Sequence, residues 1–194
     1  MDDRSTDTLE DQGQLIRGCM AGDRLAQHRL YHLFAPRLFA VCQRYCDARA
    51  EAEDVLQEGF IRIFTHIGQF KHEGSFEGWM RRIMVNCALQ RYSSKSRMAP
   101  VVSMQEEVHA GAEDNSAPAQ IGQKELLALV QKLPPTYRMV FNLYVFEGMK
   151  HREIAALLNI SEGTSKSNLS DARSILQREV LKLDASMAKK FGSL

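Results

Sequence analysis

Short polar and basic side chains share one face of a predicted helix that begins near residue 162. Apolar residues mark its other face at helical spacing: Leu169, Ala172, Leu176, Val180 and Leu183. The polar face carries groups that can reach a phosphate or a base edge: Lys166, Ser167, Ser170 and Arg173. These four residues are therefore candidate contacts to the major groove of DNA.

Together with the residues that precede it, this helix predicts a helix-turn-helix over residues 150–178. A first helix has apolar residues at helical spacing, namely Ile154, Ala155, Leu157 and Leu158. Asn159 tolerates the left-handed backbone that a tight break requires. Ser161 is a favourable N-cap for the second helix. The alternative is an ordinary helical hairpin in a small domain.

A second helix with a partner-facing side is predicted over residues 51–68. Its apolar stripe consists of Leu56, Phe60, Ile63, Phe64 and Ile67. Asp54, Gln57, Glu58 and Arg62 lie off the stripe and are expected to remain available to a partner.

A break over residues 68–75 precedes a basic helix, for which Ser75 is the expected cap. Its apolar stripe is Phe76, Trp79, Met80, Ile83 and Cys87, which makes Trp79 a core residue rather than a base-stacking one. No acidic residue lies between Gly78 and Gln105, whereas five residues there are basic: Arg81, Arg82, Arg91, Lys95 and Arg97. Such a run is either a solvated face or a nucleic-acid contact.

Strand-like alternation is not sustained anywhere, so we expect an all-α fold of two small helical domains joined by a flexible linker. The domains span residues 10–95 and 122–185, and the acidic linker spans residues 96–121. Further apolar patterns predict one or two helices joined near Pro36, and two short helices before the helix-turn-helix. The expected core residues around Pro36 are Leu30, Leu33, Phe34, Leu38, Val41 and Tyr45. Those of the first short helix are Leu126, Leu127, Leu129, Val130 and Leu133, and those of the second are Tyr137, Val140, Phe141, Tyr144 and Val145.

The net charge of +1 conceals a segregation of charge along the chain. Residues 15–97 hold 13 basic and 8 acidic residues, and residues 123–194 hold 11 and 7. Between them, residues 98–122 hold four acids and no lysine or arginine. Two basic modules separated by an acidic linker are compatible with nucleic-acid binding.

No apolar run long enough for a membrane span and no secretory leader is found in the sequence, which predicts a cytoplasmic protein. Cys42 and Cys46 lie one helical turn apart, downstream of His28 and His32. A zinc site is conceivable, but without a CxxC pair we favour buried free thiols for all four cysteines and predict no metal or other cofactor.

Three stretches, in this order, resemble bacterial RNA polymerase sigma factors of the sigma-70 family, extracytoplasmic-function (ECF) group. AEDVLQEGFIRIF (52–64) is similar to their polymerase-binding stretch. FKHEGSFEGWMRRIMVNCALQRY (70–92) is similar to their −10 recognition and melting segment, and LPPTYRMVFNLYVFEGMKHREIAALLNISEGTSKSNLSDAR (133–173) to their −35-binding domain. The resemblance implies a factor that binds core RNA polymerase, recognises −10 and −35 promoter elements and promotes DNA melting.

The resemblance also implies roles for particular residues. Asp54, Gln57 and Glu58 would bind the β′ clamp helices, and the β subunit would be a further partner. The −10 DNA would contact a loop and the helix after it, at Phe70, Lys71, His72, Glu73, Gly74, Ser75, Arg82, Asn86 and Arg91. The −35 duplex would contact Arg152, Lys166, Ser167, Ser170 and Arg173. The linker would run through the polymerase channel that later carries RNA, and an anti-sigma factor would be a further partner.

Three residues in the second helix of the predicted helix-turn-helix depart from the family's pattern. Ser165 stands where an apolar residue is frequent, and Asn168 and Asp171 stand where basic residues are frequent. Asp171 would repel phosphate, so we expect it to point away from the DNA backbone or to accept a hydrogen bond from a cytosine amine.

Two other classes of function explain less of the sequence. A free-standing helix-turn-helix regulator that binds an operator as a dimer would explain residues 150–178 but leaves residues 54–58 and 81–97 without a role. An enzyme finds no support, since the sequence has no Gly-rich phosphate loop, HExxH or GxSxG motif, and no small-molecule substrate is expected. The histidines are interpreted as surface or structural residues.

Overall fold

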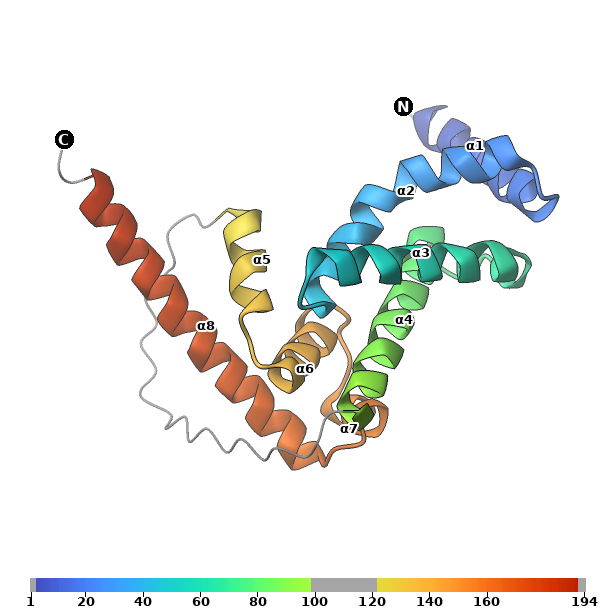
Figure 1. Ribbon diagram of the computed structural model, residues 1–194. Helices are drawn as coiled ribbons and strands as arrows, with labels where there is room; N and C mark the ends of the chain where they lie inside the picture. Colours follow the sequence, from blue (N-terminus) through green and yellow to red (C-terminus); the bar gives the residue numbers. More distant parts are fainter. Residues whose placement is uncertain (1–2, 99–121, 192–194) are drawn as a thin grey trace. The chain divides into compact units, whose positions relative to one another are not determined.

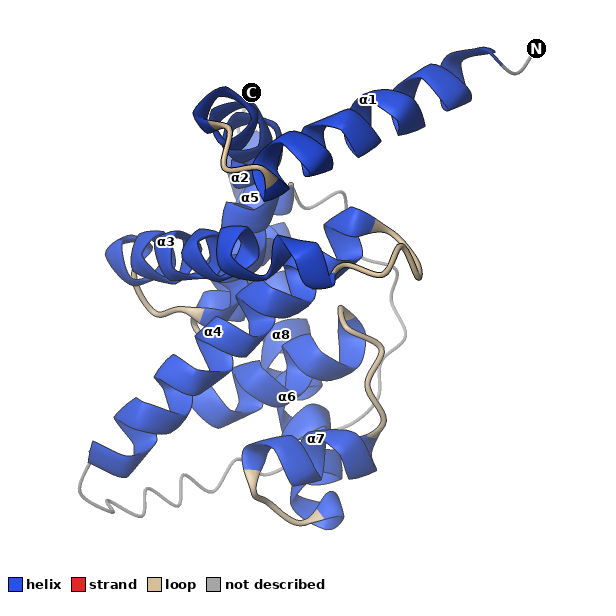
Figure 2. Ribbon diagram, turned by 90° about the vertical axis from the view of Figure 1, so that its right-hand side faces the viewer, coloured by secondary structure: helices blue, strands red, loops and turns tan. Residues whose placement is uncertain are grey.

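The computed structural model describes the backbone of residues 3–98 and 122–191, with side chains described within residues 12–94 and 125–183. All described elements are helices, and no strand occurs within those two ranges, which confirms the all-α prediction (Figure 2). The chain forms two compact units, residues 1–94 and 95–194. Most of the predicted linker, residues 99–121, lies outside the described residues.

The first unit contains four α-helices and a short 3-10 helix (Figure 1). The helices are α1 (Asp3–Met20), α2 (Arg24–Tyr45), α3 (Arg49–His66) and α4 (Phe76–Met98), and the 3-10 helix η1 (Ile67–Gln69) follows α3. The long helix α2 packs against both α1 and α3. The core of the first unit includes side chains from α2, α3 and α4 that are almost fully buried: Leu30, Leu38, Ile63, Met80 and Met84.

The Met84 side chain of α4 packs directly onto Gly59 of α3. A β-carbon added at Gly59 would lie 2.1 Å from Sδ of Met84 on α4. The glycine therefore permits a close helix contact that a larger residue would obstruct. This contact positions α3, which carries the predicted polymerase-binding residues, against α4, which carries the basic run.

The segment around Pro36 forms one continuous helix, and one of its predicted core residues is wrong. Leu33 is 60% exposed, whereas Leu30, Phe34, Leu38, Val41 and Tyr45 are buried. These buried residues repeat at intervals of three and four, and Leu33 falls beside that stripe. Pro36 is accommodated within α2, where its ring faces the exposed side.

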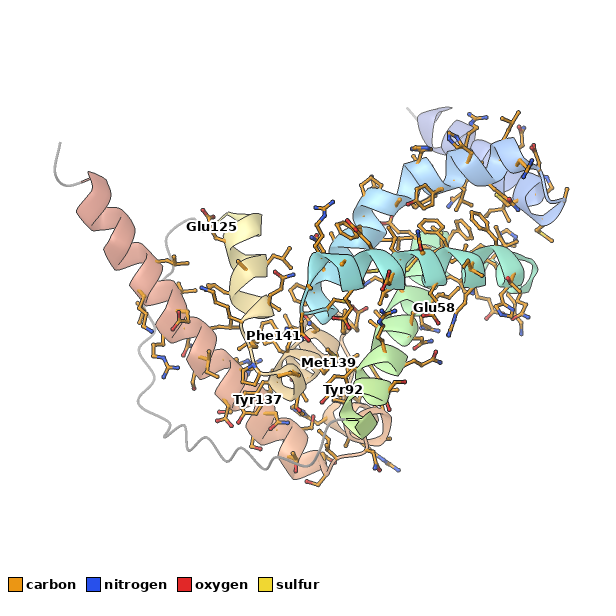
Figure 3. The ribbon with its side chains drawn as sticks, viewed as in Figure 1. Glu58, Tyr92, Glu125, Tyr137, Met139 and Phe141 are labelled. Carbon is orange, nitrogen blue, oxygen red and sulfur yellow. The ribbon has the colours of Figure 1, made fainter. Side chains whose placement is uncertain are left out.

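The second unit packs three short helices, α5 (Gln123–Gln131), α6 (Pro135–Val145) and α7 (His151–Leu158), against the long helix α8 (Glu162–Phe191), as Figure 1 shows. Tyr137 and Phe141 of α6 (labelled in Figure 3) pack against a buried cluster of residues from α5, the turn that follows it, and α8. This cluster consists of Leu129, Val130, Leu133, Ala172 and Leu176.

The predicted turn of the helix-turn-helix is confirmed in detail. Asn159 ends α7 with φ 55° and ψ 47°, the left-handed conformation expected there. The Ser161 hydroxyl accepts a hydrogen bond from the backbone N–H of Thr164 at 2.9 Å and so caps α8. Ile154 and Ala155 are buried as predicted, but Leu157 is 46% exposed because it lies beside the face that α7 turns toward α8.

Other predictions for this unit need correction. Leu126 and Val145 are exposed, since each falls at the edge of its helix's buried stripe. The last helix continues beyond the predicted helix-turn-helix of residues 150–178, since α8 has 30 residues and ends at Phe191. No glycine or proline occurs between residues 164 and 191, so nothing in the backbone interrupts it.

Candidate nucleic-acid interface

The exposed side of α8 presents all four residues that the sequence predicted as DNA contacts. Lys166, Ser167, Ser170 and Arg173 are exposed, and Arg152 is exposed on α7. Lys166 forms an ion pair with Glu162 at 2.7 Å. The adjoining carboxylate lowers the charge that Lys166 presents, and the lysine in turn lowers the pKa of Glu162.

Two of the three residues that depart from the family pattern lie inside the unit. Ser165 is fully buried, and its Oγ lies 3.0 Å from Nδ1 of His151 on α7. Asn168 is 7% exposed. Neither side chain can therefore read a base, and the departure at Ser165 is compensated by a polar partner in the interior. Asp171 is only half-buried.

An aromatic stack adjoins the candidate DNA face. The ring of Tyr144 on α6 stacks on His151, with 4.7 Å between ring centroids and 25° between planes. The guanidinium carbon of Arg173 lies 5.7 Å from the centroid of the Tyr144 ring. The sequence pattern places Tyr144 only on an apolar stripe, because the partners of this ring lie on two other helices.

The acidic face of α3 is largely engaged in ion pairs within the unit. Asp54 Oδ2 lies 2.6 Å from Nη2 of Arg91 on α4. Glu58 on α3, labelled in Figure 3, pairs with Arg62. Gln57 is exposed and lines a hollow of about 440 Å³ between α2 and α3, together with Tyr31 and Glu53. Asp54 and Glu58 are therefore each paired with an arginine, Arg91 on α4 and Arg62 one turn further along α3. Their availability to a partner stays a prediction.

The loop before α4 has an aromatic base and an exposed polar rim. Phe70 lies 5.0 Å from Phe76 and 5.8 Å from Trp79, measured between ring centroids. The rim residues Lys71, His72, Glu73, Gly74 and Ser75 are all exposed. His72 has φ 58° and Gly74 has φ 90°, so the loop turns sharply at both positions. The Ser75 hydroxyl accepts a hydrogen bond from the Gly78 N–H at 3.0 Å, which confirms the predicted cap.

Two of the three α4 residues predicted to contact the −10 DNA are exposed. Arg82 and Asn86 are exposed, whereas Arg91 is half-buried and paired with Asp54 and, at 3.9 Å, with Glu51. Trp79 is half-buried and stacks on Phe76 with 5.6 Å between centroids. This geometry agrees with an aromatic wall beside an exposed loop, a combination that can hold an unstacked base.

All four cysteines are buried and free, as predicted. Burial raises the pKa of the Cys42 thiol to about 12, with smaller contributions from the neighbouring Cys46 and Cys87. Nε2 atoms of His28 and His32 lie 3.0 Å apart on the exposed side of α2. Over the described side chains, no three His, Cys, Asp or Glu residues are arranged to hold a metal ion. Likewise, none of the described helices is both long and apolar enough to cross a membrane.

Comparisons with known proteins agree with the order of these surfaces along the chain. The family model for Sigma-70 region 2 matches residues 30–98, and the model for Sigma-70, region 4 matches residues 123–176. The ECF RNA polymerase sigma factor SigE of Mycolicibacterium smegmatis is 30% identical over 176 residues, which cover 87% of this chain and 68% of that protein. The RNA polymerase sigma-H factor of Pseudomonas aeruginosa is 26% identical over 182 residues, which cover 88% and 94%.

Among solved structures, the sigma factor RpoE of Bartonella quintana, in complex with the anti-sigma factor NepR, is similar to this chain with a TM-score of 0.47 and 24% identity. The match covers 81% of this chain and 97% of that one.

Proposed function

This chain belongs to the ECF group of RNA polymerase sigma factors, and from that premise we propose how its two units divide promoter recognition. As a member of this family, it recognises promoters for transcription initiation. In our proposal, residues 10–95 bind core polymerase and recognise and melt the −10 element. Residues 122–185 bind the −35 element, and residues 96–121 link the two.

For the first unit, we propose that Asp54, Gln57 and Glu58 on α3 contact the polymerase clamp. The loop and helix beside them would contact the −10 DNA, through Phe70, Lys71, His72, Glu73, Gly74, Ser75, Arg82, Asn86 and Arg91. The exposed loop over an aromatic base supports this assignment. Because Asp54 and Arg91 pair with each other, the clamp and the DNA would each compete with an internal ion pair.

For the second unit, we propose that α8 enters the major groove of the −35 element while Arg152 contacts the backbone. One observation carries this assignment: Lys166, Ser167, Ser170 and Arg173 are exposed together, while two neighbouring polar residues, Ser165 and Asn168, are buried. The exposed side of the helix therefore presents short polar and basic groups.

Lysine substitutions on α8 test the −35 assignment. Lys166→Ala should weaken binding of the polymerase complex to a promoter and lower its salt slope by about 0.9, as expected when one phosphate contact is lost. Lys182→Ala is the matched control, because Lys182 lies on the same helix, is equally exposed and also pairs with a glutamate at 2.7 Å. Equal effects of the two variants would refute the assignment.

Carboxylate substitutions test the polymerase assignment. Asp54→Ala combined with Gln57→Ala should weaken association with core polymerase. Glu77→Ala should not, although Glu77 likewise carries an ion-paired carboxylate, to Arg37 at 3.0 Å. Unchanged association of the double variant, with folding verified by circular dichroism, would show that the clamp binds elsewhere.

Run-off transcription separates this function from that of a free-standing regulator. The chain should direct initiation from specific promoters only with core polymerase and should bind promoter duplex poorly alone. Tight operator binding without polymerase, and no initiation with it, would favour a dimeric regulator instead. The anti-sigma partner implied by the family resemblance stays a prediction.

A further inference from the structure

The Tyr144 ring lies between two side chains of neighbouring helices in the second unit. On one side it stacks on His151 of α7, and on another it faces the guanidinium of Arg173 on α8. Three helices of the helix-turn-helix unit therefore meet at one aromatic ring. The arginine in this group is one of the exposed residues assigned above to the −35 DNA.

A polar contact with a buried residue fixes the histidine on which the Tyr144 ring stacks. His151 Nδ1 lies 3.0 Å from Oγ of Ser165, which is fully buried. A buried hydroxyl strongly favours keeping its hydrogen bond, so the histidine ring is held against α8. Since Ser165 and Arg173 both belong to α8, the stacked rings are anchored on the same helix that they support.

The chemistry of this support differs from that of two other candidate contacts, Lys166 and Arg91. Lys166 is held by Glu162 and Arg91 by Asp54, so a carboxylate neutralises each charge. Within the described part of the chain, Arg173 has no carboxylate partner and lies over a tyrosine face. A ring attracts the guanidinium through its π-electrons but leaves the N–H donors free for a phosphate. The ring thus restricts a flexible side chain without consuming its charge.

We propose that Tyr144 is a positioning residue for promoter binding, which holds Arg173 in the orientation that contacts the −35 DNA. His151 and Ser165 hold Tyr144 in turn. This inference rests on the proposed function of Arg173. It concerns a residue on α6, outside the DNA-facing helix, that need not touch DNA itself.

Substitutions of Tyr144 in the full chain, bound to core polymerase, test the inference. Tyr144→Met and Tyr144→Leu remove the aromatic face, and we expect promoter affinity to fall about two- to fivefold, the effect of losing one exposed cation–π contact. Tyr144→Phe retains the face and should bind like the parent protein. Circular dichroism shows whether each variant folds, and either aliphatic variant suffices if the other does not.

A double-mutant cycle with Arg173→Ala separates positioning from a purely structural role. Arg173→Ala should lower both affinity and salt slope, whereas Arg178→Ala, which removes an exposed arginine of the same helix, should not. If Tyr144 acts through Arg173, Tyr144→Met has no further effect once Arg173 is alanine.

The outcomes distinguish this inference from the proposed function. An effect of Tyr144→Met that persists in the Arg173→Ala background, or no effect in the parent protein, overturns the positioning role and leaves the −35 assignment intact. If Arg173→Ala itself behaves like Arg178→Ala, the assignment of Arg173 to DNA fails and the positioning role fails with it.

Discussion

Replacing Gly59 by alanine should destabilise the first unit through the contact between α3 and α4. The added methyl group would lie 2.1 Å from Sδ and 2.7 Å from Cε of Met84. The thioether is flexible, but Met84 is fully buried, so it would have to turn among closely packed neighbours. Either the methionine adopts a poor rotamer or the two helices separate.

The expected size follows from two opposing contributions. Overpacking a buried site costs about 1–3 kcal/mol, and a contact this short belongs in the upper part of that range. Alanine in place of glycine within a helix returns about 1 kcal/mol. The free energy of unfolding of the first unit should therefore fall by about 1–2 kcal/mol.

Urea unfolding of the full chain, followed by tryptophan fluorescence, measures this change. Trp79 is the only tryptophan in the sequence, and it packs against Phe70 and Phe76 of the first unit. Its emission therefore reports unfolding of that unit without a signal from the second. The midpoint and slope of the transition give the free energy of unfolding.

Two comparisons decide whether the reasoning holds. Gly13→Ala in α1 places its methyl group 3.5 Å from Arg17, an ordinary contact, and should leave the unit as stable or stabilise it by about 0.5–1 kcal/mol. Shortening the neighbour with Met84→Val should relieve part of the cost of Gly59→Ala. A Gly59→Ala protein as stable as the parent, or a cost unchanged by Met84→Val, would refute the steric explanation.

Three further predictions concern caps, backbone strain and titration. Ser161→Ala should lower the stability of the second unit by about 1 kcal/mol in thermal melts followed by circular dichroism, whereas Ser167→Ala, on the exposed side, should be nearly neutral. In the same melts, Asn159→Ala should cost about 1–2 kcal/mol because φ is 55° there, and Asn159→Gly should cost little; equal costs would contradict the strain argument. The Cys42 pKa is about 12 in the folded chain against an ordinary 9.0. The stability that its neutral thiol contributes is therefore fully present below pH 9, and the free energy of unfolding should decline as pH rises from 9 toward 12. Cys42→Ala should flatten that decline, measured by urea unfolding at each pH, and an unchanged decline would assign it to other groups.

Features set by neighbouring residues in the chain could be predicted from the sequence. The cap at Ser161, the cap at Ser75 and the left-handed residue Asn159 each depend on backbone groups within about four positions. The buried stripe at Leu169 and Ala172 depends only on the period of a helix. The resemblance to the sigma-70 family rested on such local stretches and was confirmed by the family models.

Features that join separate elements could not be predicted in this way. The Asp54–Arg91 pair spans 37 positions, and the family resemblance assigns its two members to different partners. Leu33 and Leu157 were expected in the core, but which edge of a helical stripe is covered depends on where its neighbour packs.

The sequence by itself determined the helices, their caps and the family, because these depend on local backbone preferences and on helical periodicity. Only the tertiary structure decided that Ser165 is an interior residue paired with His151, and that Tyr144 lies under Arg173. Both depend on the packing of α6 and α7 against α8, which brings together side chains that no spacing along the chain relates.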